Sequence, residues 1–247
     1  MDPLHRLGWS PSLAAAFEPL RLADPSLVPA RVASDHRESL RVLLASGEER
    51  IAAPSGRLRH TAAPGGLPVA GDWVALEVPP GGGAAVVHAV LPRRTVLSRR
   101  EAGEGAVGAQ LLAAQVDTVF VAAPLDREVR PRLLERALAL AWEGGADPVV
   151  LLTKSDLDPD PAGRAAAAEA ACPGARVLAV SASTGAGVEA LGEWLLPGRT
   201  VVLLGPSGAG KSTLANRLLG ADLLEIGEVR AEDQRGRHTT VARRLVV

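Results

Sequence analysis

Several residue types are scarce in this chain of 247 residues, and each scarcity excludes a class of protein. Cys172 is the single cysteine, so the sequence cannot form an internal disulfide or a multi-cysteine metal site. No uninterrupted apolar stretch approaches the ~18 residues that a membrane-spanning helix needs, and residues 1–9 lack the pattern of a secretory signal. We therefore expect a cytoplasmic protein that makes no membrane contact.

Lysine is almost absent. Of the 27 lysines and arginines only Lys154 and Lys211 are lysine, and the other 25 are arginine. There is also no tyrosine, which indicates a compositional bias across the whole chain. The two remaining lysines are therefore the first places to look for chemistry in which arginine is not an equivalent replacement. A hydrophobic content of 47% and a net charge of −1 exclude a largely disordered chain.

Residues 30–95 have the pattern of a small antiparallel β-barrel. Short strand-like runs are separated by clusters of glycine and proline. The expected strands are Ser39–Ala45, Glu49–Ala53, Gly56–His60, Gly71–Val78 and Ala84–Leu91. Five such strands in about 60 residues favour the five-stranded oligonucleotide-binding barrel, or OB-fold. We expect residues 1–29 to form an N-terminal extension and residues 96–115 to form a linker.

From residue 116 onward, strand-like and helical patterns alternate. Such alternation predicts an α/β domain in which helices flank a parallel sheet. The expected strands are Val119–Ala123, Pro148–Leu152, Arg176–Val180 and Thr200–Leu204. The expected helices are Arg132–Trp142, Pro161–Ala171, Val188–Leu195 and Lys211–Leu219.

The strongest motif follows the strand Thr200–Leu204 directly. Residues 205–212 read GPSGAGKS and match the phosphate-loop pattern GxxxxGK[ST], between an expected strand and an expected helix. Its glycines let backbone N–H groups point at phosphate oxygens, and the helix presents its positive end. We expect Lys211 to contact the β- and γ-phosphates and Ser212 to bind Mg²⁺. The expected ligands of the nucleotide in this segment are Gly205, Pro206, Ser207, Gly208, Ala209, Gly210, Lys211, Ser212 and Thr213.

Two further motifs, each after an expected strand, point to a guanine base. Residues 153–156 read TKSD and resemble the [N/T]KxD motif of translation-factor-type GTPases, although a simple helix start would also fit them. An aspartate there can accept from two N–H groups on the guanine edge, a donor pair that adenine lacks. Residues 181–185 read SASTG and match the SAxxG loop that supports the base in such GTPases. The expected base-binding residues are Thr153, Lys154, Ser155, Asp156, Ser181, Ala182 and Ser183.

The order of the motifs is unusual, because the base motifs precede the phosphate loop. This order predicts a circularly permuted P-loop GTPase domain over residues 116–247. A permuted GTPase domain behind a small barrel resembles the ribosome small-subunit-dependent GTPase A family of bacteria. Four further segments carry the resemblance: GDWV at 71–74, LPRRT at 91–95, AAQVD at 113–117 and GRHTT at 236–240. Gln115 stands where that family usually has asparagine.

The resemblance implies a function and several residue roles. It implies binding of GTP and GDP with Mg²⁺, hydrolysis of GTP stimulated by the small (30S) ribosomal subunit, and a monomer that binds ribosomal RNA during late subunit maturation. Thr239 or Thr240 of the first switch would complete the Mg²⁺ shell. Lys211 and His238 are the expected catalytic residues, with His238 orienting the attacking water; a solvated loop histidine is the alternative.

The chain departs from the family's pattern after the first switch, where relatives continue into a strand ending in DTPG and then a zinc-binding domain. We expect a GTPase domain without its last strand and without zinc. Two DxxG matches, Asp160–Gly163 and Asp233–Gly236, do not follow apolar strands. We further expect the phosphate-loop strand to lie at a sheet edge and residues 221–247 to be poorly ordered. Alternatives are a truncated nucleotide- and RNA-binding module without useful turnover, and, less favoured by TKSD and SASTG, a P-loop ATPase or kinase.

RNA contact by the barrel is expected to be electrostatic. Trp73 is the main aromatic residue offered for base stacking, so arginine-to-phosphate contacts would dominate and binding would depend on salt. The candidate arginines are Arg31, Arg37, Arg41, Arg50, Arg57, Arg59, Arg93, Arg94, Arg99 and Arg100.

Overall fold

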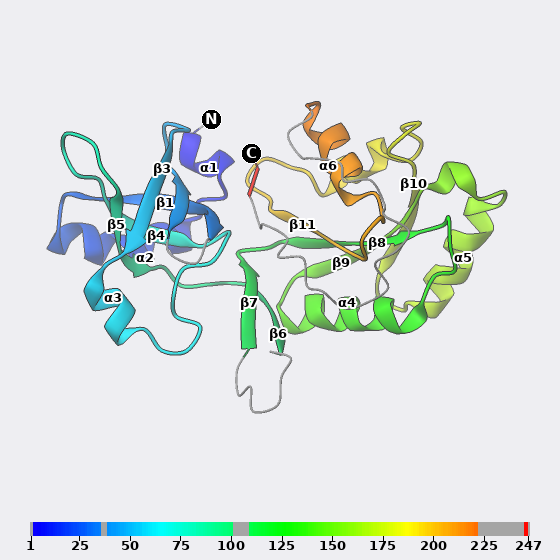
Figure 1. Ribbon diagram of the computed structural model, residues 1–247, viewed down its shortest axis with the longest axis horizontal. Helices are drawn as coiled ribbons and strands as arrows, with labels where there is room; N and C mark the ends of the chain where they lie inside the picture. Colours follow the sequence, from blue (N-terminus) through cyan, green and yellow to red (C-terminus); the bar gives the residue numbers. More distant parts are fainter. Residues whose placement is uncertain (1, 36–38, 101–108, 222–244, 247) are drawn as a thin grey trace. The chain divides into compact units, whose positions relative to one another are not determined.

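The computed structural model describes residues 2–35, 39–100, 109–221 and 245–246 (Figure 1). Within these ranges the chain divides into two compact units. The first holds residues 2–116, 197–199 and 245–246, and the second holds residues 117–196 and 200–221. A search of the described helices finds none that is both long enough and apolar enough to cross a membrane.

Two helices precede the barrel in the first unit. α1 (Pro3–Arg6) and α2 (Pro11–Ala23) each have proline in the first turn, where the missing N–H is not needed. The side chains of Asp2 and Ser10 accept backbone N–H groups at the two helix starts and act as N-caps. Phe17 of α2 is buried in a cluster with strand residues of the barrel, so α2 covers part of the barrel's outer surface.

The barrel has five strands, and it is closed. They are β1 (Leu27–Asp35), β2 (Leu40–Leu43), β3 (Glu49–Pro54), β4 (Trp73–Glu77) and β5 (Ala85–Val90). Their order is β1-β2-β3-β5-β4, and β4 pairs with β1 to close the ring. The β3–β5 pair is parallel and the others are antiparallel. Small and branched aliphatic side chains fill the interior, so the predicted small barrel is confirmed.

One of the five predicted strands was wrong. The segment predicted as the strand Gly56–His60 is the helix α3 (Gly56–Thr61), because the Ser55 hydroxyl accepts the N–H of Leu58 and caps a helical turn. The strand that replaces it in the barrel is β1, which the sequence reading missed. Pro29 lies within β1, and proline inside a run weakens a strand prediction.

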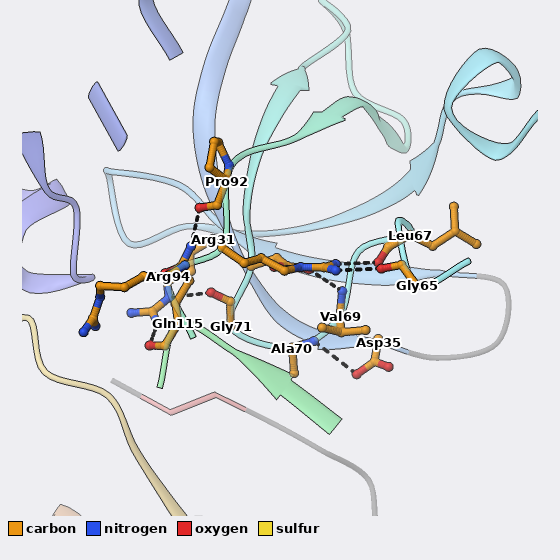
Figure 2. Close-up of polar contacts among 12 residues, drawn as sticks. Arg31, Asp35, Gly65, Leu67, Val69, Ala70, Gly71, Pro92, Arg94 and Gln115 are labelled. Atoms are coloured by element: carbon orange, nitrogen blue, oxygen red, sulfur yellow. Dashed lines mark hydrogen bonds and ion pairs between the residues drawn. The ribbon is translucent and has the colours of Figure 1, made fainter. Parts of the chain in front are cut away.

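Two residues expected to face RNA are instead part of the interior. Trp73 is fully buried and packs edge-to-face against Trp9 with ring centroids 4.7 Å apart, so it is no stacking platform. Arg31 is also buried, and its guanidinium donates to the backbone carbonyls of Gly71 and Gln115 (Figure 2). It also donates to the carbonyl of Leu7. Both expectations of RNA contact are corrected, because these side chains are buried where the N-terminal segment packs against the barrel.

Arg93, another arginine expected to contact RNA, also forms its hydrogen bonds within the first unit. Its guanidinium contacts both carboxylate oxygens of the buried Asp72, at 2.8 and 2.7 Å. The remaining N–H groups donate to the carbonyls of Gly65 and Leu67, which Figure 2 draws on the loop before β4. A bidentate pair of this kind fixes the loop, because removal of either partner would leave a poorly solvated charge.

The segment 96–115, expected as a linker, contains a hairpin. β6 (Val96–Arg100) pairs antiparallel with β7 (Ala109–Ala114). Gln115 follows at φ +56°, in the left-handed region that asparagine adopts more readily than glutamine. Its amide nevertheless donates to the carbonyl of Pro92 at 2.9 Å and accepts the N–H of Arg94 at 3.3 Å (Figure 2). These two bonds hold the glutamine at the position where the family usually has asparagine.

The second unit is a parallel sheet with helices on both faces. Its strands are β8 (Thr118–Pro124), β9 (Asp147–Thr153), β10 (Arg176–Val180) and β11 (Val201–Leu204), in the order β10-β9-β8-β11 and all parallel. The helices α4 (Pro131–Glu143) and α5 (Pro161–Ala171) pack on β8, β9 and β10. α6 (Lys211–Leu219) lies on the opposite side of the sheet from α4 (Figure 1). The predicted parallel α/β arrangement is confirmed.

Two shorter elements complete the unit. η1 (Ser155–Leu157) is a single 3₁₀ turn after β9, and η2 (Glu189–Glu193) is a 3₁₀ segment where the sequence predicted the α-helix Val188–Leu195. That prediction was wrong in type, although Leu191 of η2 is buried in the sheet's core with Leu214 of α6. Gly192 within the segment lowers the α-helical propensity.

Among the described strands, β11 lies at the edge of this sheet, as expected. Of residues 221–247, only 221, 245 and 246 are described, so the expectation of poor order lies largely outside the described residues. The N–H of Leu245 donates to the carbonyl of Ala33 in β1, within the first unit.

Candidate nucleotide-binding site

The phosphate loop joins the end of β11 to the start of α6. Gly205 has φ +149°, and a Cβ there would lie 2.5 Å from the carbonyl oxygen of Ala122 in the neighbouring strand β8. Only glycine therefore lets the loop leave the sheet so close to β8. The loop then leads into α6, whose first turn contains Lys211, Ser212 and Thr213. Backbone N–H groups of this first turn are available for an anion, as the motif predicts.

The side chain of Lys211 lies against the loop that precedes it. Its Nζ donates to the carbonyls of Gly205 at 2.9 Å and Pro206 at 2.7 Å. Burial lowers the pKa of Lys211, because taking an ammonium out of water disfavours its charged form. A phosphate placed here would reverse that effect, since an opposite charge at short range favours the ammonium.

The TKSD segment begins where β9 ends, and its first residue is bonded to the phosphate loop. The buried Thr153 hydroxyl donates to the carbonyl of Ala209 at 2.7 Å. Lys154 follows at φ +58°, a left-handed conformation that turns the chain sharply after the strand. The two segments, 56 residues apart in the chain, therefore meet at the carboxyl ends of β9 and β11.

The carboxylate of Asp156 is held by the other base motif. The pKa of Asp156 is lowered, chiefly by the hydroxyl of Ser181. Ser183 and the positive charge of Lys154 lower it further, while partial desolvation acts in the opposite direction. Asp156 is exposed, so this carboxylate is both oriented and free to meet a ligand. TKSD begins at Thr153 and SASTG follows Val180, and these two residues are paired at the ends of the neighbouring strands β9 and β10, so the two segments lie close together.

The SASTG loop has its own internal bonds. The N–H of Ser181 donates to the carbonyl of Ala186 at 2.9 Å, and the N–H of Gly185 donates to the carbonyl of Ser181 at 2.9 Å. The Ser181 and Ser183 hydroxyls lie 2.9 Å apart. A compact turn of this kind holds its hydroxyls in a defined position.

Three charged residues that sequence reasoning missed belong to this region. Asp126 accepts from Lys154 Nζ at 2.5 Å and from Arg127 Nε at 3.1 Å. Burial raises the pKa of Asp126, but these hydrogen bonds outweigh it and lower the pKa overall. Arg127 also donates to the carbonyl of Gly208 at 3.4 Å. Arg217 of α6 donates to two backbone carbonyls of the SASTG loop.

A sequence signal existed for one of these. Asp126 lies two residues after the end of the buried strand β8, and polar residues at the carboxyl ends of parallel strands gather at one edge of a sheet. Nothing in the spacing of Arg217 indicates its partners, because they lie 34 and 35 residues away on another loop.

The remaining predicted site residues are placed in part. Ser155 is buried in η1, and Ser212 and Thr213 are half-buried at the start of α6. His238, Thr239 and Thr240 lie outside the described residues. No group of three or more His, Cys, Asp or Glu side chains in the described ranges is arranged to hold a metal ion. The hydroxyl of Ser212 next to a phosphate loop fits Mg²⁺, which takes few protein oxygens and completes its shell with phosphates and water.

Comparison with known proteins gives concordant results. The family model described as RsgA GTPase matches residues 90–247. A protein of Opitutus terrae, named small ribosomal subunit biogenesis GTPase RsgA, is 47% identical over 98% of this chain and 68% of its own length. The protein of the same name from Streptomyces coelicolor is 44% identical over 98% of this chain and 65% of its own length. The chain thus spans about two thirds of the length of these curated relatives.

Two solved structures are similar in fold. The crystal structure of YjeQ from Thermotoga maritima has a TM-score of 0.61 and 26% identity, covering 78% of this chain and 65% of that one. The structure of YloQ, described as a circularly permuted GTPase, has a TM-score of 0.56 and 19% identity, covering 77% of this chain and 63% of that one. The permuted motif order and the α/β sheet observed here agree with these neighbours.

Proposed function

Because this chain belongs to the RsgA GTPase family, we propose that it binds guanine nucleotides and hydrolyses GTP to GDP and phosphate in the maturation of the small ribosomal subunit. One observation carries the proposal: in permuted order along the chain, TKSD is bonded to the phosphate loop through Thr153, and SASTG is bonded through Arg217 to the helix that follows this loop. Ligands bind at this end of open α/β sheets.

The nucleotide is held at both ends in this proposal. Asp156 accepts from the N1 and 2-amino N–H groups of guanine, while the stem of Lys154 covers the base plane. The backbone of residues 205–213 receives the phosphates, and Lys211 exchanges its carbonyl partners for β- and γ-phosphate oxygens. Asp126 holds the ammonium of Lys154 in place for this contact.

Magnesium would be held by the hydroxyl of Ser212 and by Thr239 or Thr240. When bound, Mg²⁺ neutralises charge that develops on the phosphate oxygens. Lys211 stabilises the same charge from the side of the phosphate loop. His238 would orient the attacking water by hydrogen bonding. Positioning and charge stabilisation of this sort account for most of the catalysis in phosphoryl transfer.

A turnover assay tests the hydrolysis. Multiple-turnover phosphate release from GTP is measured with and without purified small ribosomal subunits. We expect Mg²⁺-dependent release that the subunits stimulate, because a bound partner can order catalytic groups near the phosphates. Nucleotide binding without release under either condition would instead identify a nucleotide- and RNA-binding module without useful turnover. Tighter binding of ADP than of GDP would contradict the guanine assignment.

The partner in this proposal is the RNA of the small subunit, contacted by a cytoplasmic monomer through the barrel. The support is a set of exposed arginines on the first unit. Arg41, Arg59 and Arg99 make water-exposed contacts with Glu49, the carbonyl of Pro54 and the amide of Gln110, which contribute little to stability and leave the charge accessible. The set consists of the exposed residues Arg41, Arg57, Arg59 and Arg99.

Salt dependence tests the RNA contact. The affinity for small subunits should fall steeply between about 50 and about 200 mM salt, because arginine-to-phosphate contacts release counterions. Replacing both Arg57 and Arg59 with glutamine should flatten the slope of log affinity against log salt by about 1 to 2. Arg136→Gln on α4 is the control and should leave the slope unchanged. An affinity that hardly responds to salt would contradict phosphate recognition.

A further inference from the structure

Arg217 links the phosphate-binding helix to the base-binding loop. It lies near the end of α6, and its Nη1 donates to the carbonyl of Ala182 at 2.8 Å and to that of Ser183 at 3.2 Å. A guanidinium bonded to two consecutive carbonyls restrains the loop more than a neutral donor would, because hydrogen bonds from charged groups are the stronger ones. The position of the SASTG loop is therefore tied to α6.

Gly185 leaves the space in which this guanidinium lies. A Cβ at Gly185 would clash with Nη2 of Arg217, and the residue also has φ +93°, which other residues rarely adopt. The glycine of the SASTG motif thus allows the backbone conformation of the turn and also leaves room for the guanidinium of Arg217. Two observations, the carbonyl bonds and the space at Gly185, place the Arg217 head against this loop.

The same loop controls the carboxylate that meets the base. The Ser181 hydroxyl, and to a lesser degree that of Ser183, lowers the pKa of the Asp156 carboxylate, and Ser183 is also one of the two residues whose carbonyls Arg217 binds. A shift of the loop therefore moves the hydroxyls that aim the Asp156 carboxylate. The guanidinium of Arg217 is bonded to the loop's carbonyls in this arrangement, so its influence on the base passes through the loop.

We propose that Arg217 is a positioning residue for guanine selectivity: it clamps the SASTG loop so that both oxygens of Asp156 are aligned with the two N–H donors of guanine. The inference rests on the proposed function, because it assumes that Asp156 reads a guanine base. Hypoxanthine has the N1–H donor but lacks the 2-amino group. The ratio of the affinities for GDP and IDP therefore reports how well Asp156 is aligned with the base. This ratio is more informative than either affinity alone, because the two nucleotides differ only in the 2-amino group.

The test compares the affinities of the full chain for GDP and IDP by calorimetry in the presence of Mg²⁺. For Arg217→Ala we expect the preference for GDP to fall roughly three- to tenfold, the range for losing one net hydrogen-bond contribution. Arg217→Lys should keep more of the preference than Arg217→Ala, because a lysine ammonium can still donate to one or both carbonyls. It should not keep all of it, because the ammonium lacks the rigid planar geometry of the guanidinium. Arg136→Ala, an exposed arginine on α4, should leave the preference as in wild type.

The outcomes separate the two levels of the proposal. A wild-type chain that does not prefer GDP to IDP would contradict the guanine site itself. A wild-type chain with a clear preference that Arg217→Ala retains would overturn the role of Arg217 alone. An equal loss of affinity for GDP and IDP would also overturn it, since that result indicates a general weakening of the pocket. Alanine is a good helix former, so the exposed position on α6 should tolerate the change.

Discussion

Asp156→Asn is expected to lower the affinity for GDP by about 100-fold or more and to create a preference for XDP. A carboxylate offers two acceptors to the two N–H donors of guanine. An asparagine amide offers one acceptor and one donor, which match the N1–H and the C2 carbonyl of xanthine. The hydrogen bond from Ser181 lowers the pKa of Asp156, so the wild-type group is fully ionised at neutral pH and presents both acceptors.

Competition binding with GDP, XDP and ADP measures this change. Asp160→Asn is the matched control, because Asp160 caps α5 by accepting the N–H of Gly163, and asparagine is an equally good N-cap. The control should keep both the fold and the preference for GDP. A variant at Asp156 that binds GDP within a few-fold of wild type would show that this carboxylate does not read the base.

Lys211→Ala is expected to lower GTP turnover at least about 100-fold, the usual loss when one charge-stabilising donor is removed from such a site. The nucleotide-free protein should keep its thermal stability. The two carbonyls that Lys211 contacts belong to residues that water can reach, and removing a partly buried ammonium relieves a desolvation penalty.

Two measurements separate catalysis from folding for this variant. Phosphate release in the presence of small subunits reports turnover, and the rise in Tm caused by a fixed excess of GDP reports binding to the folded state. We expect the first to be lost and the second to shrink. Lys211→Arg should not restore turnover, because the larger forked head cannot occupy the place of a compact ammonium. Turnover close to wild type in the alanine variant would exclude Lys211 from catalysis.

The sequence predicted most of the second unit, and the reason is local. The helix Pro161–Ala171 was predicted to its bounds, and its proline start and Asp160 cap are signals within a few residues. The two central strands, β8 and β9, are continuous apolar runs, as expected for strands buried on both faces. The phosphate loop was recognisable because its conformation requires glycine and lysine at fixed positions. This requirement does not depend on the rest of the fold.

The first unit was harder to predict. The helix α3 depends on a single serine cap at Ser55 in a segment whose composition also fits a strand, and β1 contains a proline. The RNA-facing interpretation of Arg31 and Trp73 was wrong for a different reason. The sequence does not show whether an arginine faces solvent or is buried. Arg31 is buried, and its guanidinium donates to the carbonyls of Leu7, Gly71 and Gln115.

The amino-acid sequence by itself predicted which chemistry this protein carries: its two lysines lie in two of the three motifs expected to bind nucleotide, and the motif order showed the permutation. The tertiary structure decided which side chains support those motifs. Asp126 reaches Lys154, Arg217 reaches the SASTG loop, and Thr153 reaches the phosphate loop across 28 to 56 residues of chain. A motif can be recognised in the sequence because its residues are neighbours in the chain and set the conformation of one short segment. The long-range contacts form only when the parallel sheet brings the ends of its strands together.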